Sequence, residues 1–427
     1  MRGLILIAVI ALMTVAGLYA QEKDITQEEQ KISLELIWAK EIPEWVKDFV
    51  FLDEDGYNVF SVQCKDSEKA LKNKRILMIQ EGKLRVYEGD EMKMTNEISL
   101  RGGHITISKN GRNIATIDGL ERDPSGKGGY TAKPATLRLY NWKGEELAQT
   151  QFSPPAGLEY ILLYPLGDDQ AVAVGLSGNE GLYHGLKIFV RRGKILREAF
   201  SNDETSWVVD YAENGDRVLV ALENKYMVLF NGAGKEVCRY ICPRAYRKGF
   251  LSPKGNYIAE ITAGKYVMIF DRQGRLIAEH HVQGQGNYYA AFSPDEKCLC
   301  VTPGPWRVYF FETKTGKLLW EYVDTLSRFR SIAVAPVSNN TFLSSTLYHP
   351  TNYSLQEMAD KVLVVINHIG EVMRKDIVSS VKTAEELEFY RWKSVAPPLR
   401  ITPDGRFLLV RLPNRLLLYL VKNGGER

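Results

Sequence analysis

Short apolar stretches alternate with polar turns along most of this chain. The stretches are rich in Val, Ile, Leu, Phe and Tyr, and the turns between them contain Pro, Asp, Asn or Gly, as in residues 292–323. Such stretches are too short for typical helices and have the composition of strands. Several are apolar throughout, which predicts strands covered on both faces. The pattern therefore predicts an all-β protein.

The order of strands and turns repeats. In residues 292–323 a strand precedes Ser293-Pro294-Asp295-Glu296, two apolar strands follow, and a Gly-Lys turn leads into a last strand. Residues 251–280 have the same order, and related turns occur at 53–56, 108–111, 167–169, 213–216, 338–340 and 402–405. A period of roughly 40 to 45 residues is typical of propeller blades, which are stable only when stacked. We predict a single β-propeller of about eight four-stranded blades, or seven if one weaker copy is an insertion.

The two ends of the chain are predicted to complete one blade. The last copy ends at residues 416–421, and no outer strand follows before Arg427. Residues 34–40 resemble the outer strand of another copy, at 317–322. We therefore expect a strand within residues 32–42 to close the last blade, which would also remove an open strand edge.

The repeat resembles that of known bacterial propellers. A Ser-Pro-Asp or Ser-Pro-Lys turn, a later aromatic strand and a Gly-Lys turn look like the WD40-like and YVTN-type propellers. Residues 312–320, Glu-Thr-Lys-Thr-Gly-Lys-Leu-Leu-Trp, are similar to the blade motif of quinoprotein-like (PQQ-type) propellers. The resemblance extends over most of the chain as a repeat pattern. It implies a fold and not an activity, because such folds host many functions.

The N-terminus has the pattern of an export signal. Arg2 precedes an apolar run at 3–20, and the chain turns polar at Gln21. We expect a signal peptide, residues 1–20, followed by a β-propeller domain, residues 21–427. An uncleaved membrane anchor is the alternative, because the run is close to the shortest length that spans a bilayer. We expect a periplasmic or extracellular protein with no membrane span after cleavage.

The charge balance bears on possible partners, and the cysteine content bears on disulfide bonding. Lys and Arg number 55 against 52 Asp and Glu, and no basic stripe is present, so nucleic acid is not an expected partner. The five cysteines are an odd number for an oxidising compartment. Cys298 and Cys300 are two apart on a predicted strand and should face the core together. We expect buried free thiols, with a local Cys238–Cys242 bridge as the alternative.

No catalytic or cofactor motif is recognisable. HExxH, GxSxG and phosphate-loop patterns do not occur. His280 and His281 are adjacent on a predicted strand and should point to opposite faces, which predicts a polar outer-strand pair and not a metal site. The acidic turns at 53–56 and 168–169 lack the ligand register of a calcium loop, so calcium is only a weak candidate. We predict no catalytic, cofactor or metal-binding residues.

Insertions indicate where a binding surface could lie. They occupy residues 64–74, 119–133, 177–185 and 347–361, and the last contains the candidate partner-binding residues Tyr348, His349 and Tyr353. Exposed aromatic loops on a rigid scaffold are frequent binding sites. The leading hypothesis is a monomeric, non-enzymatic extracytoplasmic scaffold or sensor that binds a protein or peptide. The alternatives are a hydrolase or lyase at the channel mouth, with or without a metal, and a quinone-dependent oxidoreductase.

Overall fold

The structure is a computed structural model of residues 1–427. It describes residues 33–41, 60–63, 75–80, 83–88, 93–102, 104–108, 112–121, 130–131, 133–155, 158–166, 171–178, 183–202, 206–212, 217–222, 225–244, 246–284, 289–303, 306–324, 327–334, 341–347, 360–367, 369–379, 399–401, 407–411 and 415–422. The expected signal peptide lies outside the described residues.

The first half of the chain supplies blades 1 to 4, numbered in chain order. Blade 1 consists of β2 (Phe60–Gln63), β3 (Arg75–Gln80), β4 (Lys83–Glu88) and β5 (Lys93–Ser99). Blade 2 consists of β6 (His104–Ile107), β7 (Asn113–Asp118), β8 (Ala135–Asn141) and β9 (Glu146–Phe152). Blade 3 consists of β10 (Leu158–Leu166), β11 (Ala171–Gly178), β12 (Tyr183–Arg192) and β13 (Ile195–Asn202). Blade 4 consists of β14 (Ser206–Tyr211), β15 (Arg217–Leu222), β16 (Tyr226–Asn231) and β17 (Glu236–Ile241).

The second half supplies blades 5 to 8. Blade 5 consists of β18 (Tyr246–Leu251), β19 (Tyr257–Thr262), β20 (Tyr266–Asp271) and β21 (Leu276–His281). Blade 6 consists of β22 (Tyr289–Phe292), β23 (Cys298–Thr302), β24 (Arg307–Glu312) and β25 (Leu318–Val323). Blade 7 consists of β26 (Ser327–Val334), β27 (Thr341–Leu347), β28 (Asp360–Ile366) and β29 (Val372–Ser379). Blade 8 consists of β30 (Leu399–Ile401), β31 (Phe407–Arg411), β32 (Arg415–Lys422) and β1 (Ser33–Glu41).

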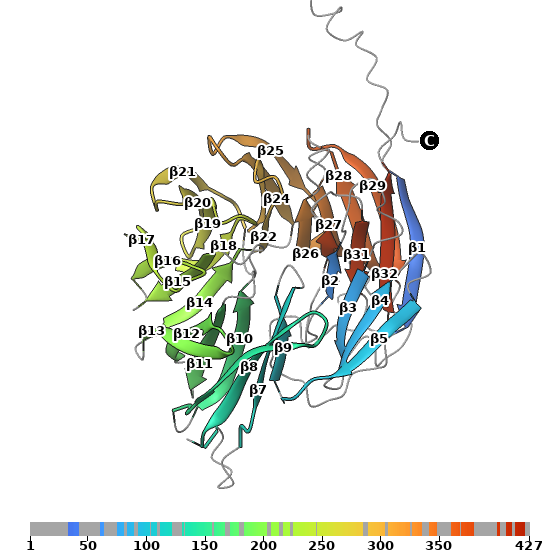
Figure 1. Cartoon of the computed structure of the whole chain (residues 1–427). Helices are drawn as coiled ribbons and strands as arrows, with labels where there is room; N and C mark the ends of the chain where they lie inside the picture. Colours follow the sequence, from blue (N-terminus) through green and yellow to red (C-terminus); the bar gives the residue numbers. More distant parts are fainter. Residues whose placement is uncertain are drawn as a thin grey trace, which may run out of the picture.

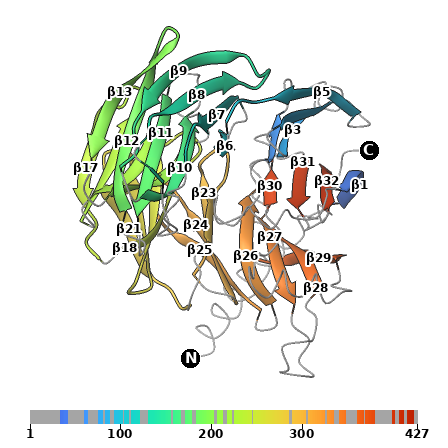
Figure 2. The same cartoon turned by 90° about the horizontal axis from the view of Figure 1, so that it is seen from below.

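The blades form the predicted ring. Within each blade the strands pair antiparallel in the order given, the first strand lies nearest the centre and the fourth lies at the rim (Figures 1 and 2). Neighbouring first strands contact one another, as β14 does with β18 and β22 with β26. The structure thus confirms an all-β propeller with eight four-stranded blades among its described residues.

Most of the predicted turns occupy one position in the repeat. The turns at 108–111, 167–169, 213–216, 338–340 and 402–405 each fall between the first and second strands of a blade, as do those that begin at Ser252 and Ser293. The acidic segment 53–56 is different, because it precedes β2 and does not separate two strands of blade 1. It therefore does not mark the equivalent turn of the first blade.

The N-terminal strand closes the last blade, as predicted. β1 pairs antiparallel with β32 from Ser33 opposite Lys422 to Glu41 opposite Arg415. Leu34 is buried in the cluster shared by blades 7 and 8, together with Leu363, Leu399 and Val421. The first and last described strands are thus hydrogen-bonded neighbours, which closes the eighth blade.

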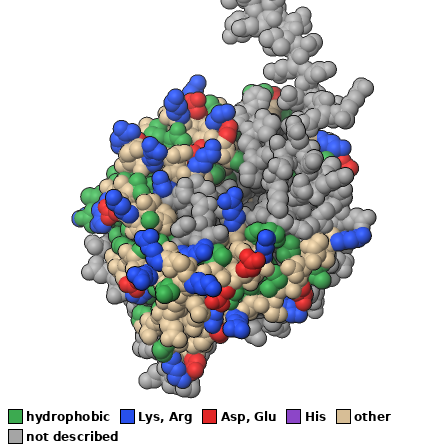
Figure 3. Space-filling view, viewed as in Figure 1, with side chains coloured by type: hydrophobic (Ala, Val, Ile, Leu, Met, Phe, Trp, Pro, Cys, Tyr) green, Lys and Arg blue, Asp and Glu red, His purple; other side chains and the backbone are tan. Residues whose placement is uncertain are grey.

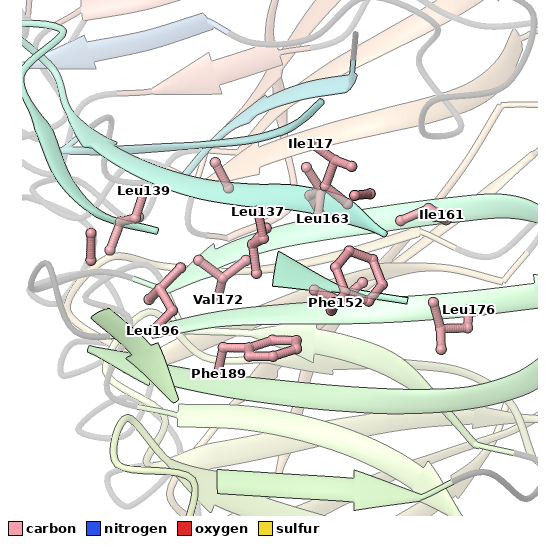
Figure 4. Close-up of a cluster of buried hydrophobic side chains, with 14 of the residues drawn as sticks. Ile117, Leu137, Leu139, Phe152, Ile161, Leu163, Val172, Leu176, Phe189 and Leu196 are labelled. Carbon is pink, nitrogen blue, oxygen red and sulfur yellow. The ribbon is translucent and has the colours of Figure 1, made fainter. Parts of the chain in front are cut away.

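The hydrophobic core lies between the blades. Seven neighbouring pairs, from blades 1 and 2 to blades 7 and 8, each share a cluster of buried apolar side chains. Figure 4 shows the cluster of blades 2 and 3, where Ile117 and Leu137 from one blade face Val172 and Phe189 from the other. A buried Leu, Val, Ile or Phe side chain contributes about 1.5 to 3 kcal/mol relative to its exposed state. Because both faces of a blade are covered in this way, its middle strands are mostly apolar.

Polar side chains join neighbouring turns near the centre of the ring. The carboxylate of Glu296, in blade 6, accepts hydrogen bonds from Ser252 Oγ (2.6 Å), the Lys254 amide (2.7 Å) and Asn256 Nδ2 (2.7 Å) of blade 5. Asp210 of blade 4 likewise accepts the amide of Leu251 of blade 5, at 2.8 Å. These bonds satisfy turn amides that strand pairing leaves free.

The turn between the third and fourth strands packs on the preceding blade. Its glycine has a positive φ in six described blades, and in five of them an added Cβ would touch a side chain of that blade. The five glycines and the side chains they meet are Gly144 on Ile98, Gly234 on Ala199, Gly274 on Tyr240, Gly316 on Ala278 and Gly370 on Trp320. The glycine is therefore required both for its backbone conformation and for close blade packing.

Blade 3 departs from this arrangement. Its third and fourth strands are longer than those of blades 4 to 6, and a Cβ on its turn glycine, Gly193, would meet nothing within 4 Å. The start of β13 instead pairs in parallel with β9, Ile195 opposite Gln149, and the Gln149 amide donates to the Lys194 carbonyl at 3.1 Å. The pairing joins blades 2 and 3 into one sheet at the rim (Figure 2).

The closing strand offers a direct test of ring stability. Leu34 is buried, whereas Leu36 on the same strand is exposed. Leu34→Ala should therefore lower the free energy of unfolding by about 2 to 4 kcal/mol. Leu36→Ala should lower it by less than about 0.5 kcal/mol. Urea unfolding of the two variants measures the difference, and equal losses would contradict the proposed role of β1.

The glycine turns provide a second matched pair. Gly193 and Gly316 have similar positive φ values, 66° and 70°, so alanine costs about 1 kcal/mol of backbone strain at either position. Only at position 316 would the new methyl group overlap the side chain of Ala278. Gly316→Ala should therefore lose roughly 1 to 3 kcal/mol more stability than Gly193→Ala. Thermal unfolding of both variants tests this, and indistinguishable melting temperatures would rule out tight blade contact at Gly316.

Candidate functional site

The aromatic loop residues predicted from the sequence cannot be placed. Tyr348, His349 and Tyr353 lie outside the described residues, between the end of β27 at Leu347 and the start of β28 at Asp360. The same is true of the acidic turns at 53–56 and 168–169. The candidate site is therefore built from described residues.

Large apolar side chains are exposed on blades 6 and 7. Six of the twelve exposed large hydrophobic residues in the described part of the chain belong to these two blades, with exposures between 38% and 51%. We call this set the apolar rim, and it consists of Trp306, Leu318, Leu319, Val323, Ile369 and Val372. Exposed large apolar side chains are candidates for an interaction surface.

Strand β25 is the centre of the apolar rim. It is the last strand of its sheet, so among the described strands nothing pairs with its outer edge. Trp320 points inward and is buried, with its ring stacked on Phe310 at a centroid distance of 4.7 Å and an interplanar angle of 7°. Gly370 of blade 7 packs on the same tryptophan. The strand is thus held firmly on one side while Leu318, Leu319 and Val323 stay exposed.

A buried carboxyl group lies between blades 4 and 5. Glu260 on β19 is fully buried, at a position where other blades have Thr116, Val220 or Val301. Its Oε1 accepts a hydrogen bond from the hydroxyl group of Tyr240 on β17, at 2.7 Å. Glu260 therefore places a carboxyl group where these other blades have valine or threonine, and such departures are candidates for a special role.

Burial determines how the groups around Glu260 ionise. Burial raises the pKa of Glu260, although hydrogen bonds from Cys242 and Tyr240 oppose the shift. Burial and then the neighbouring Glu260 raise the pKa of Tyr240 well above its ordinary value. Burial is also the main reason why the pKa of Cys242 rises to about 12. All three shifts favour the neutral form of each group, which fits a hydrogen-bonded joint between the two blades.

The described cysteines are free thiols. Cys298 and Cys300 are both buried in the cluster of blades 6 and 7, as predicted. Burial raises the pKa of Cys298 to about 11, which makes its thiol a poor nucleophile at neutral pH. Cys238 lies within β17 and Cys242 follows that strand, so about 13 Å of extended chain separates them. The alternative of a local Cys238–Cys242 bridge is thus wrong for this fold, because a disulfide needs Cα atoms within about 7 Å.

The inner strands carry a few polar and aromatic contacts. The hydroxyl group of Tyr130, from the 119–133 insertion, lies 3.0 Å from His104 Nε2 on β6. Lys248 Nζ lies 5.0 Å from the ring centroid of Tyr289 and 5.7 Å from that of Phe250. The Lys248–Tyr289 contact joins blades 5 and 6, whereas the other two contacts each lie within one blade. These contacts bring no carboxylate groups together.

The paired histidines contact different neighbours. His280 Nε2 lies 2.6 Å from the carbonyl of Gly316 in blade 6, and its ring packs on Phe311. His281 packs on Tyr266 within its own blade. Within the described residues, no three His, Cys, Asp or Glu side chains come together in a way that could hold a metal ion. The described residues also include no helix with the length and apolarity needed to cross a membrane.

Comparisons with known proteins agree on the fold only. No protein-family model and no curated protein matches the sequence. Among solved structures, the computationally designed Ika8 protein is similar over 85% of this chain and 96% of its own, with 11% identity and a TM-score of 0.53. BamB from Moraxella catarrhalis matches over 91% of this chain and 100% of its own, with 12% identity and a TM-score of 0.49. Raptor from Chaetomium thermophilum matches over 77% of this chain but 28% of its own, with 13% identity and a TM-score of 0.44.

These similarities define the class of protein. The chain is a β-propeller, and its likeness to solved structures extends over most of its length. At such low identity the likeness shows the fold and no activity. The similarity of residues 312–320 to quinoprotein-like blades remains a similarity of one repeat.

The titration of Glu260 can be measured through stability. The pKa of Glu260 is raised above 4.5 in the folded state. At pH values between 4.5 and this raised pKa, the folded protein therefore holds a proton that the unfolded chain has lost. The free energy of unfolding therefore falls as the pH rises from 4.5 through the raised pKa. Glu260→Gln removes this dependence, so its melting temperature relative to wild type should increase between pH 4.5 and about pH 8. The exposed Glu145→Gln is the control, and a difference for Glu260→Gln that is constant with pH would refute the buried titration.

Proposed function

We propose that this protein is an exported, non-enzymatic β-propeller scaffold or sensor that binds a protein or peptide partner along the apolar rim. The observation that supports it most is the open edge of β25 with exposed Leu318, Leu319 and Val323 beside it. An exposed strand edge can pair with an extended peptide through main-chain hydrogen bonds, while flanking side chains select its residues. An exported scaffold of this kind would act in the periplasm or outside the cell.

The edge is suited to a specific partner because its framework is rigid. Trp320 is fixed between Phe310 and Gly370, so the exposed side chains of β25 lie on a strand that has little freedom to move. Binding to an ordered surface loses less conformational entropy than binding to a mobile one. Apolar side chains beside an open edge therefore favour recognition of an extended, partly apolar peptide.

The proposed surface includes the aromatic residues predicted from the sequence. Trp306 is exposed on the connection between the second and third strands of blade 6. Tyr348, His349 and Tyr353 belong to the equivalent connection of blade 7, the next blade in the ring. We propose that these aromatic residues extend the apolar rim, since tyrosine and tryptophan are frequent anchors in protein interfaces.

Site-specific crosslinking tests the proposal. A photo-reactive amino acid at Leu319 should yield a discrete adduct in intact cells of the source organism. The same label at Met94, which is exposed on the outer strand of blade 1, should not give that adduct. Leu318→Lys combined with Val323→Lys should weaken binding of the crosslinked partner by about tenfold or more, because charged edge residues oppose strand pairing.

The outcomes separate the proposal from its alternatives. Equal labelling from positions 319 and 94 would show that β25 is merely exposed. A partner whose affinity is unchanged by the two lysine substitutions would bind elsewhere on the ring. Circular dichroism of the double variant controls for misfolding, because both side chains are exposed and their replacement should leave the blade intact.

A further inference from the structure

The tip of the hairpin formed by β12 and β13 carries positive charges around an exposed apolar residue. Arg192, Lys194 and Arg197 are all exposed, and Ile195 between them is 52% exposed. No acidic residue occurs within residues 189–197. This is the same hairpin whose turn does not pack on the preceding blade.

Strand pairing places these side chains on one face of the hairpin. Arg192 is directly opposite Ile195, and Val190 is directly opposite Arg197. Side chains two apart on a strand share a face, and so do directly opposed side chains. Arg192, Ile195 and Arg197 therefore lie on the face that Val190 turns toward blade 4.

Blade 4 adds another base beside this face. An added Cβ on Gly234 would lie 3.6 Å from Val190, and Lys235, which follows Gly234, is exposed. We call Arg192, Lys194, Ile195, Arg197 and Lys235 the basic tip. In Figure 3, Lys and Arg side chains are spread over the described surface of the ring.

The carboxylates nearest to the basic tip in sequence are already paired with other bases. Glu198 forms an ion pair with Lys187 at 3.0 Å, and Glu236 forms one with Arg239 at 2.8 Å. The positive charge of the basic tip is therefore not neutralised by these neighbours. An anionic partner would gain these electrostatic interactions without breaking an existing ion pair.

The length of the hairpin has a structural explanation, but its side chains do not. The parallel pair of Ile195 with Gln149 covers part of the β9 edge, which is a reason to extend the two strands. Leu196 points to the opposite face and packs in the cluster of blades 2 and 3. Neither role requires bases or an exposed isoleucine on the face toward blade 4.

We propose that the basic tip is an interaction surface for an acidic segment of a protein partner that also presents an apolar side chain. Arginine guanidinium groups bind carboxylates in a bidentate manner, and Ile195 supplies an apolar contact among them. The surface is small, and a rigid hairpin holds it, which fits a short peptide segment better than an extended lipid surface. It lies on blades 3 and 4, so it goes beyond the binding at the apolar rim and is tested separately.

A defined acidic polymer is the probe. Fluorescein-labelled poly(Glu,Tyr), an acidic and aromatic copolymer, should bind the wild-type protein in an anisotropy titration at low salt, and added salt should weaken the binding. Arg192→Glu combined with Arg197→Glu should weaken it by about tenfold or more. Lys235→Glu, which lies on another blade, should weaken it in the same direction. Ile195→Ser should reduce the preference for poly(Glu,Tyr) over polyglutamate.

Matched controls make the result decisive. Arg272→Glu combined with Lys314→Glu reverses two exposed charges on the turns of blades 5 and 6 and should leave the affinity unchanged. If both double variants lost the same affinity for the copolymer, binding would depend only on the net charge of the protein, and the proposal would be overturned. Binding to phosphatidylglycerol vesicles with none to the copolymer would overturn it in favour of a lipid partner. An unchanged melting temperature in each variant confirms that the fold is intact.

Discussion

The packing of each blade against the next is the interaction on which the whole structure depends. A single four-stranded sheet cannot cover its own two faces, and here nearly every middle strand is apolar on both. The clusters between blades satisfy this requirement in turn around the ring, and the glycine turns bring the sheets close enough for their side chains to interlock. The same constraint explains why Glu296 and Glu260, which lie between blades, each accept a hydrogen bond from a side chain of a neighbouring blade. The architecture leaves the rim and the turns as the places where sequence can vary for function.

Residues with a role beyond blade packing are therefore easiest to identify where a blade departs from the common pattern. Blade 6 keeps the repeat but exposes apolar side chains beside an open edge, and blade 3 lengthens a hairpin and surrounds Ile195 with bases. Packing of one blade on another explains neither feature. Glu260 is the opposite case, since it is buried and hydrogen-bonded to Tyr240 of the neighbouring blade, which fits a structural joint. The departures in blades 3 and 6 are exposed and can contact a partner, whereas Glu260 is buried and can contact only its own blades.

The ring could be predicted from the sequence because each repeat is marked by short turn and strand motifs. Turns such as Ser252-Pro253-Lys254-Gly255 recur at one position of the blade, and their spacing gave the number of blades. The closing strand was predictable because residues 34–40 resemble an outer strand that the last copy lacks. The buried state of Glu260 was not predictable, because an isolated glutamate in Ile-Ala-Glu-Ile-Thr looks like a solvent-facing position. Its burial depends on Tyr240 from another blade, and the exposure of β25 likewise depends on how far blade 7 extends over it. The predicted roles of Tyr348, His349 and Tyr353 stay predictions.

The pairing of β1 with β32 also determines when the protein can finish folding. Residues 33–41 pair with residues 415–422, so the eighth sheet cannot form until residues 415–422 have been made. Blades 1 to 7 are built from consecutive strands and can assemble earlier. The final step then joins segments nearly four hundred residues apart, at the largest loop-closure cost in the molecule, which grows only slowly with length. Ring closure therefore comes late, and until it occurs the outer edge of β32 is an unpaired strand open to wrong partners.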